Sequence, residues 1–230
     1  MTGNGPRDLF EILYVPEVVS AGSDPAVGQL ESLVRLAAGY QFREDGVVEH
    51  LRRICAYVGA LATACNWPAR ETLLLRHAAL LHDVGMTDVP ESILRKEGKL
   101  TDVETAMVKR HPELGRALLG EVDTPLLREA AALAWTHHEA FDGSGYPRGI
   151  RGDAIPAGAR ILAVADVFEA LTARDRPYKQ PMKLSQALKI LGFMKKDKHI
   201  DPDVFDLFVN TGLHRRYAEA ELNPDQIDEA

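Results

Sequence analysis

Apolar residues recur along one stretch of the chain at alternating steps of four and three, at Val47, Leu51, Ile54, Val58, Leu61 and Cys65. An α-helix repeats every ~3.6 residues, so these side chains share one helix face. Similar spacing predicts further helices at about 27–38, 70–83, 101–111, 112–119, 125–138, 159–172, 184–194 and 203–212, with a short turn near Ile93. Patterns typical of strands are scarce. We therefore predict an all-α fold.

The length of the chain, 230 residues, suits one domain with accessory segments. We assign residues 41–222 to that domain. Residues 1–40 are too few for an independent sensor domain and are expected to form a partly helical accessory segment. The polar tail at 223–230 is expected to be frayed.

Composition and charge exclude several classes of protein. The longest unbroken apolar run, Ala130–Trp135, is far shorter than the ~18–20 residues of a membrane span. The net charge of −7 argues against binding to duplex nucleic acid or to an anionic membrane surface. The first residues lack the features of a secretory signal, so we expect a cytoplasmic protein. Cys55 and Cys65 follow the apolar face of one helix and are expected to be core residues.

Two adjacent pairs of metal-competent side chains stand out among the eight histidines of the chain, namely His82-Asp83 and His137-His138. A single histidine on a helix is more often a surface or hydrogen-bonded residue than a ligand. Two such pairs at predicted helix ends are improbable by chance, and they indicate a metal site.

Asp166 and His50 add to this set. The segment Ile161–Leu171 is apolar almost all round, which predicts a buried helix. A buried carboxylate needs a cation or strong donors, so Asp166 is interpreted as a metal ligand, with an N-cap or salt-bridge role as the alternative. His50 lies about 60° from the apolar face of its helix at ~100° per residue and can reach the same site.

A glycine-rich loop, Phe141–Gly152, directly follows His137-His138-Glu139. Its glycines allow tight turns and close backbone approach, so the loop can fold over whatever the histidines bind. The order His82-Asp83, then His137-His138-Glu139, then Asp142-Gly143-Ser144-Gly145-Tyr146-Pro147 resembles the HD-GYP family of metal-dependent phosphodiesterases. The resemblance extends over about 50–208.

The resemblance implies an HD-type helical bundle with a helical GYP extension, and hydrolysis of the bacterial second messenger cyclic diguanylate. It further implies two divalent metal ions that share Asp83. One would be held by His50, His82, Asp83 and Asp166, and the other by Asp83, His111, His137 and His138. Five imidazoles and two carboxylates without a thiolate suit iron or manganese.

The resemblance also implies a substrate site. Arg176 and Lys179 correspond to basic residues of the family that bind the substrate phosphate and act with Asp83 in catalysis, although a solvated charged turn is the alternative. The loop residues Gly145, Tyr146 and Pro147 would border the substrate.

The sequence departs from the family pattern at two positions. Met86 replaces a lysine that reaches the substrate phosphate in the family. Gly46 stands where members that hold three metals have a glutamate, with Asp45 one residue earlier, so we do not expect a third metal. In addition, the turn between Asp166 and Arg176 is one residue longer than the commonest spacing.

Three functional interpretations remain open. The intact ligand set favours an active phosphodiesterase with slow turnover. The loss of a cation at Met86 favours a module that binds cyclic diguanylate or a regulatory protein partner with little turnover. A general HD nucleotide phosphohydrolase is disfavoured because the Gly-Tyr-Pro loop is present. The sequence does not determine the oligomeric state.

Overall fold

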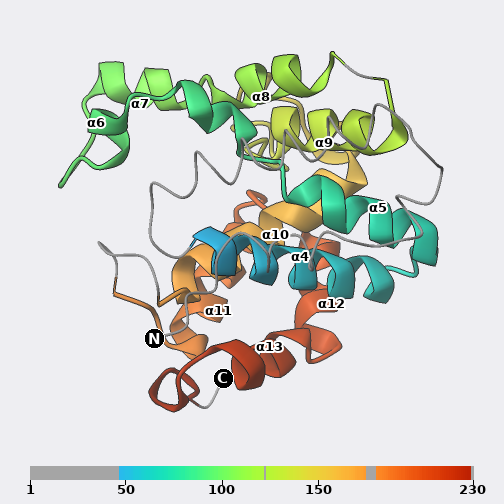
Figure 1. Cartoon of the computed structure of the whole chain (residues 1–230). Coiled ribbons are helices and arrows are strands. Elements are labelled where there is room, and N and C mark those ends of the chain that lie inside the picture. Colours follow the sequence, from blue (N-terminus) through green and yellow to red (C-terminus); the bar gives the residue numbers. More distant parts are fainter. Residues whose placement is uncertain (1–46, 122, 175–179, 229–230) are drawn as a thin grey trace, which may run out of the picture.

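Helices account for all the regular secondary structure in the described part of the chain (Figure 1). The computed structural model describes residues 47–121, 123–174 and 180–228. Its elements, in chain order, are α4 (Val47–Ala64), α5 (Ala69–Ala79), η1 (Val84–Asp88), α6 (Glu91–Leu94), α7 (Asp102–Val108), α8 (His111–Leu119), α9 (Pro125–Thr136), η2 (Gly152–Ala154), α10 (Ala157–Thr172), α11 (Leu184–Lys196), α12 (Pro202–Asn210), α13 (Leu213–Glu221) and η3 (Pro224–Gln226), where η denotes a 3-10 helix. The predicted all-α fold is confirmed.

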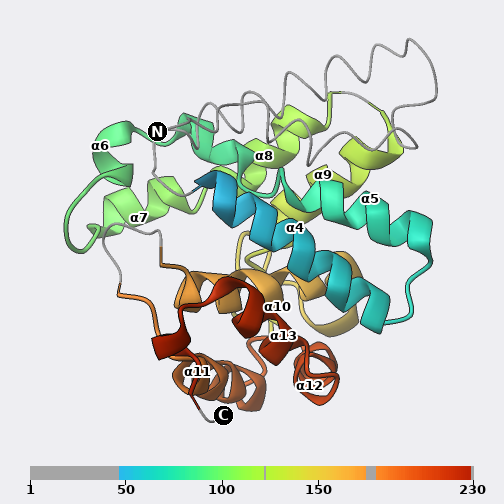
Figure 2. The same ribbon diagram turned by 60° about the horizontal axis from the view of Figure 1, so that its bottom comes forward.

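The helix α10 lies at the centre of the molecule. It packs against α4 and α9 on one side and α11 and α12 on the other, and Figure 2 shows it between α4 and the C-terminal helices. Its buried side chains include Ile161, Leu162 and Phe168, as its apolar sequence predicted. Burial of each such side chain contributes about 1.5–3 kcal/mol, so α10 is a fixed support for its polar residues.

Helix boundaries differ from the predictions where functional residues lie. The helix predicted to run to Asp83 ends at Ala79, and the chain then turns into η1. Likewise α9 ends at Thr136, so that His137 and His138 follow it in a turn. Both motif pairs therefore lie at helix ends. The helix predicted at 27–38, the accessory segment 1–40, Asp45 and Gly46 lie outside the described residues.

The C-terminal part is more ordered than its polarity predicted. Helix α13, which the pattern did not indicate, begins after Gly212 and packs against α4. The segment predicted to be frayed is docked as far as Asp228, since the buried Gln226 amide donates to the carbonyls of Thr172 and Met182 at 3.0 Å each. Asp228 accepts from the main chain and hydroxyl of Ser185. A polar sequence thus packs here because its side chains satisfy carbonyl and hydroxyl groups next to α10 and α11.

The helices α6 and α7 form an arm at the edge of the molecule (Figure 1). No residue of α7 is buried, and Val103 on it is 72% exposed. The helix is stabilised locally by a capping box between Thr101 and Glu104, and Glu104 also pairs with Lys96 at 2.6 Å. Helix α7 is therefore held by its own contacts rather than by the core, whereas α6 buries Ile93.

None of the helices in the described ranges is both long enough and apolar enough to cross a membrane.

Candidate metal centre

Seven side chains gather where α4, the turn after α5, the start of α8, the end of α9 and the middle of α10 meet. They form two groups, and within each group the potential ligand atoms lie within 4.8 Å of one another. The first contains His50, His82 and Asp166, and the second contains Asp83, His111, His137 and His138. All seven residues proposed from the sequence are thus brought together.

Asp83 lies between the two groups. One carboxylate oxygen, Oδ2, is 3.3 Å from His82 Nε2. The other, Oδ1, is 3.2 Å from His111 Nε2 and 3.4 Å from His137 Nε2. Asp83 therefore contacts histidines of both groups, each through a different carboxylate oxygen.

Three of the histidines are oriented by the main chain. In each, Nδ1 lies within hydrogen-bond distance of a carbonyl three residues earlier, at 2.7 Å for His82, 2.7 Å for His111 and 3.0 Å for His137. An Nδ1–H that donates to a carbonyl leaves Nε2 with its lone pair, which is the tautomer that binds a metal. Because each ring is at a helix end, its Nε2 points away from its own helix and toward the cluster.

The donor atoms of the second group fit a cation. With Nδ1 of each ring bound to a carbonyl, the Nε2 atoms of His111 and His137 face each other at 3.1 Å as two acceptors. Two lone pairs and the Asp83 carboxylate at this separation favour a positive charge among them, which a metal ion or a proton can supply. Imidazole and carboxylate ligands without thiolate suit a borderline divalent ion.

The pKa shifts of the ion-free cluster also favour a positive charge at this site. Burial lowers the pKa of His82, but the Asp83 and Asp166 carboxylates outweigh this effect and raise the pKa to about 9. Burial raises the pKa of Asp83, but the neighbouring His82, His111 and His137 lower it by more. The pKa of Asp83 therefore lies well below its usual range. Burial and the neighbouring His137 lower the pKa of His138 to about 2, so its ring is neutral and available as a ligand.

A close main-chain contact sets the spacing between the two halves of the cluster. A Cβ on Gly85 would lie 2.0 Å from the carbonyl oxygen of His111 and 2.4 Å from the nitrogen of Gly115. Only glycine allows η1 to approach α8 this closely. The contact places His82 and Asp83 beside His111.

The glycine-rich loop folds over the second group. The ring of Tyr146 stacks on His138 at 4.8 Å between centroids, and Lys109 Nζ lies 5.0 Å from the centre of the same ring. The buried carboxylate of Glu139 accepts hydrogen bonds from the main-chain nitrogens of Arg148 at 2.8 Å and Ile150 at 3.1 Å. Glu139 therefore fixes the loop that carries Tyr146.

The structure describes some of the remaining predicted site residues but not all of them. Gly145 and Pro147 are in the loop beside Tyr146, and a Cβ on Gly145 would lie 2.1 Å from the nitrogen of Ala140. Arg176 and Lys179 lie outside the described residues. Asp166, interpreted from the sequence as a buried carboxylate, is half-buried on α10 and lies in the group with His50 and His82.

Sequence reasoning missed Glu169 and Arg53. The Glu169 carboxylate is fully buried, 2.7 Å from His50 Nδ1 and 2.6 Å from Arg53 Nη2. A signal was present, since Glu169 follows Asp166 by three residues and so lies on the same side of an otherwise apolar helix.

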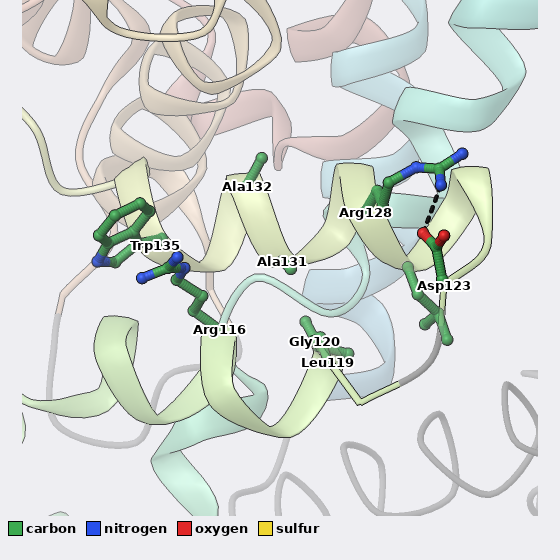
Figure 3. Close-up of a pocket in the computed structure, with 9 residues that line it drawn as sticks. Arg116, Leu119, Gly120, Asp123, Arg128, Ala131, Ala132 and Trp135 are labelled. Atoms are coloured by element: carbon green, nitrogen blue, oxygen red, sulfur yellow. Dashed lines mark hydrogen bonds and ion pairs between the residues drawn. The ribbon is translucent and has the colours of Figure 1, made fainter.

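A separate hollow of about 360 Å³ lies between α8 and α9 (Figure 3). Arg116, Arg128 and Trp135 are among its lining residues. The guanidinium of Arg116 lies 3.6 Å from the Trp135 ring centre and Arg128 pairs with Asp123. None of the seven clustered side chains lines this hollow.

Comparison with known proteins places the cluster in context. The HD domain family model matches residues 40–204. The chain is 40% identical over 176 residues to the "Cyclic di-GMP phosphodiesterase response regulator RpfG" of Xanthomonas campestris, covering 76% of this chain and 46% of the relative. It is 35% identical to a "Cyclic di-GMP phosphodiesterase" of Thermotoga maritima, covering 76% and 49%. It is 37% identical to the "3'3'-cGAMP-specific phosphodiesterase 2" of Vibrio cholerae, covering 78% and 34%.

The chain thus spans about a third to a half of the length of these relatives. Among solved structures, it resembles the HD domain of the L. monocytogenes phosphodiesterase PgpH in complex with cyclic-di-AMP, with a TM-score of 0.59, 16% identity and coverage of 80% of this chain and 96% of that one. It also resembles an HDG"Y"P protein of Bdellovibrio bacteriovorus, with a TM-score of 0.56, 20% identity and coverage of 72% and 52%. At these identities the structures support the helical fold alone.

Proposed function

Because this chain belongs to the HD domain family, we propose that it is a metal-dependent phosphodiesterase that opens cyclic diguanylate to the linear dinucleotide. The observation that carries the proposal is the pair of histidine and carboxylate groups joined by Asp83. Relatives named cyclic di-GMP phosphodiesterases, at 35% and 40% identity, support the choice of substrate.

We propose two divalent ions per chain, iron or manganese. One is assigned to His50, His82, Asp83 and Asp166, and the other to Asp83, His111, His137 and His138. When bound, such a pair supplies an activated water and positive charge for the phosphoryl oxygens of the substrate.

We assign a different role in this proposal to Asp83, to Tyr146 and to the two basic residues that follow α10. Asp83 holds the two halves of the site at a fixed separation. Tyr146 stays protonated at neutral pH, because burial and the Asp83 and Asp166 carboxylates raise its pKa, and its hydroxyl can donate to a phosphate oxygen. Arg176 and Lys179 are assigned to the second phosphate contact on the basis of the family resemblance.

A second candidate function rests on Met86. This thioether follows Asp83 by three residues, at a position that is half-buried in η1. Without a cation there, the site can bind a cyclic dinucleotide while stabilising less of the charge that develops during hydrolysis. The alternative is therefore a signalling module that binds cyclic diguanylate or a regulatory protein and turns over slowly.

Metal content and hydrolysis test the proposal together. Protein purified without chelator should contain two transition-metal ions per chain, and His82→Gln should lose most of this metal. His77→Gln is the matched control, because His77 is also buried on α5 with Nδ1 2.7 Å from a carbonyl but lies outside both groups. Wild-type protein that stays metal-free in metal-replete medium would contradict the proposal.

The substrate is tested with metal-loaded protein and four compounds, namely cyclic diguanylate, 3'3'-cGAMP, cyclic GMP and the linear dinucleotide. We expect linear product from cyclic diguanylate that disappears with chelator. Hydrolysis of 3'3'-cGAMP alone would assign the chain to the other substrate class named among its relatives. Tight binding of cyclic diguanylate with no product at full metal occupancy would favour the signalling module.

A cytoplasmic location stays a prediction.

A further inference from the structure

His50 lacks the main-chain support that His82, His111 and His137 have. Each of these three rings places Nδ1 against the carbonyl of the residue three positions earlier in the chain. His50 Nδ1 instead makes an ion-pair contact of 2.7 Å with Oε2 of Glu169, which belongs to α10, and the two groups do not have hydrogen-bond geometry. The support of His50 is therefore a side chain from another helix, and it can be removed by mutation without altering the main chain.

Glu169 is held in place by a second partner. Its other oxygen, Oε1, lies 3.0 Å from Nε and 2.6 Å from Nη2 of Arg53. The Glu169 carboxylate is fully buried and the Arg53 side chain is 7% exposed. The ion pair with Arg53 compensates for the burial of both groups and fixes the Glu169 carboxylate beside His50.

The three residues are arranged to act on one ring atom. His50 and Arg53 are one turn apart on α4, and both face Glu169 on α10. A carboxylate beside Nδ1 stabilises the proton on that nitrogen, which leaves the Nε2 lone pair for the cluster. A buried ion pair that only joined α4 to α10 would need Arg53 and Glu169 but not this contact with His50.

We infer that Glu169 is a positioning residue, which fixes the tautomer and orientation of His50 and thereby sets the metal affinity of the group formed by His50, His82 and Asp166. Arg53 fixes Glu169. The inference rests on the metal binding in the proposed function and adds a residue that the family resemblance did not assign.

The test uses Glu169→Gln in the full chain and measures binding of manganese by competition with a chelator. The wild type should bind two ions, whereas the variant should bind one ion normally and the other about 10–100-fold more weakly. The matched control is Asp201→Asn, which changes another buried carboxylate that pairs with an arginine, Arg160, at 2.7 Å but lies outside both groups. The control should bind both ions as the wild type does.

A second readout requires no metal. Nitrogen-15 NMR of metal-free protein should show His50 protonated on Nδ1 in the wild type and shifted toward the Nε2–H form in Glu169→Gln, with the His50 signal assigned by its loss in His50→Asn. A purely structural role for Glu169 predicts lower thermal stability with no change in tautomer.

The outcomes separate the inference from the proposed function. Two ions in the wild type and two equally tight ions in Glu169→Gln would overturn the inference and leave the proposed function intact. No ion in the wild type would overturn the proposed function. If Glu169→Gln does not fold, Glu169→Asp retains the charge beside Arg53 but withdraws it from His50, and unchanged affinity for both ions in that variant would also overturn the inference.

Discussion

Replacing Gly85 by alanine should damage the proposed metal centre without changing any of its proposed ligands. The added Cβ would lie 2.0 Å from the His111 carbonyl oxygen and 2.4 Å from the Gly115 nitrogen, whereas ordinary contacts begin near 3.4 Å. Both neighbours are main-chain atoms, so no side chain can rotate away. The segment η1 must therefore move from α8 by at least ~1 Å.

That displacement can be converted into expected effects. Overpacking of this kind costs about 1–3 kcal/mol, which lowers the melting temperature by roughly 2–10 °C for a chain of this size. A shift of ~1 Å also lengthens the contacts of Asp83 Oδ1 with His111 and His137, now 3.2 and 3.4 Å, past the ~3.3–3.6 Å that separates neighbouring ligands held at ~2.0–2.2 Å by one tetrahedral ion. A misplacement of ~1 Å in an active site costs about 100-fold in rate.

The assay compares Gly85→Ala with Gly192→Ala. Gly192 lies inside α11 and has no atom within 4 Å of an added Cβ, so its substitution should stabilise the protein by about 0.5–1 kcal/mol. Melting temperature, metal content and hydrolysis rate are measured for both variants. A Gly85→Ala protein with wild-type values of all three would refute the argument that this contact sets the spacing of the cluster.

Three further outcomes are expected. Met86→Lys should raise the hydrolysis rate by up to roughly 100- to 1000-fold at unchanged metal content, and an unchanged rate in a briskly active wild type would show that the lysine is dispensable. Glu139→Gln should raise KM with little loss of bound metal, because it loosens the loop that carries Tyr146. Loss of both ions in this variant would contradict the role of Glu139. Because the pKa of His82 is raised to about 9 in the ion-free protein, His82 must release a proton on binding metal, so the apparent affinity should rise about tenfold per pH unit from pH 7 and level off near pH 9. Titrations with manganese that show no pH dependence in this range would contradict it.

The sequence predicted which seven side chains lie together more completely than it predicted the contacts that support them. The seven clustered residues are recognisable because paired histidines and aspartates are rare and because Asp166 interrupts an apolar helix. The role of Gly85 could not be predicted, since it depends on how closely two segments 26 residues apart approach each other in space. Glu169 was overlooked because its partners His50 and Arg53 are more than a hundred positions away, on α4.

The spacing of apolar residues predicted the positions of most helices but not of all. Apolar spacing located most helices because each buries one face against α10 or its neighbours. It failed for α13, whose sequence is rich in charge and whose attachment depends on particular side chains. Arg52 binds Glu221 there, and Tyr57 stacks on Tyr217 at 3.6 Å. The docking of Gln226 rests on two hydrogen bonds that no periodicity reveals.

The arm formed by α6 and α7 has a consequence for how such a domain can diversify. Because α7 buries no residue and is capped by its own Thr101 and Glu104, its composition can change with little effect on the folding of the rest of the protein. Its far end nevertheless leads into Lys109, beside Tyr146 and the second histidine group. Exchanged surface side chains in this arm can therefore change the surroundings of Lys109 and Tyr146, whereas the main chain at Val108 must stay in place because its carbonyl holds the His111 ring.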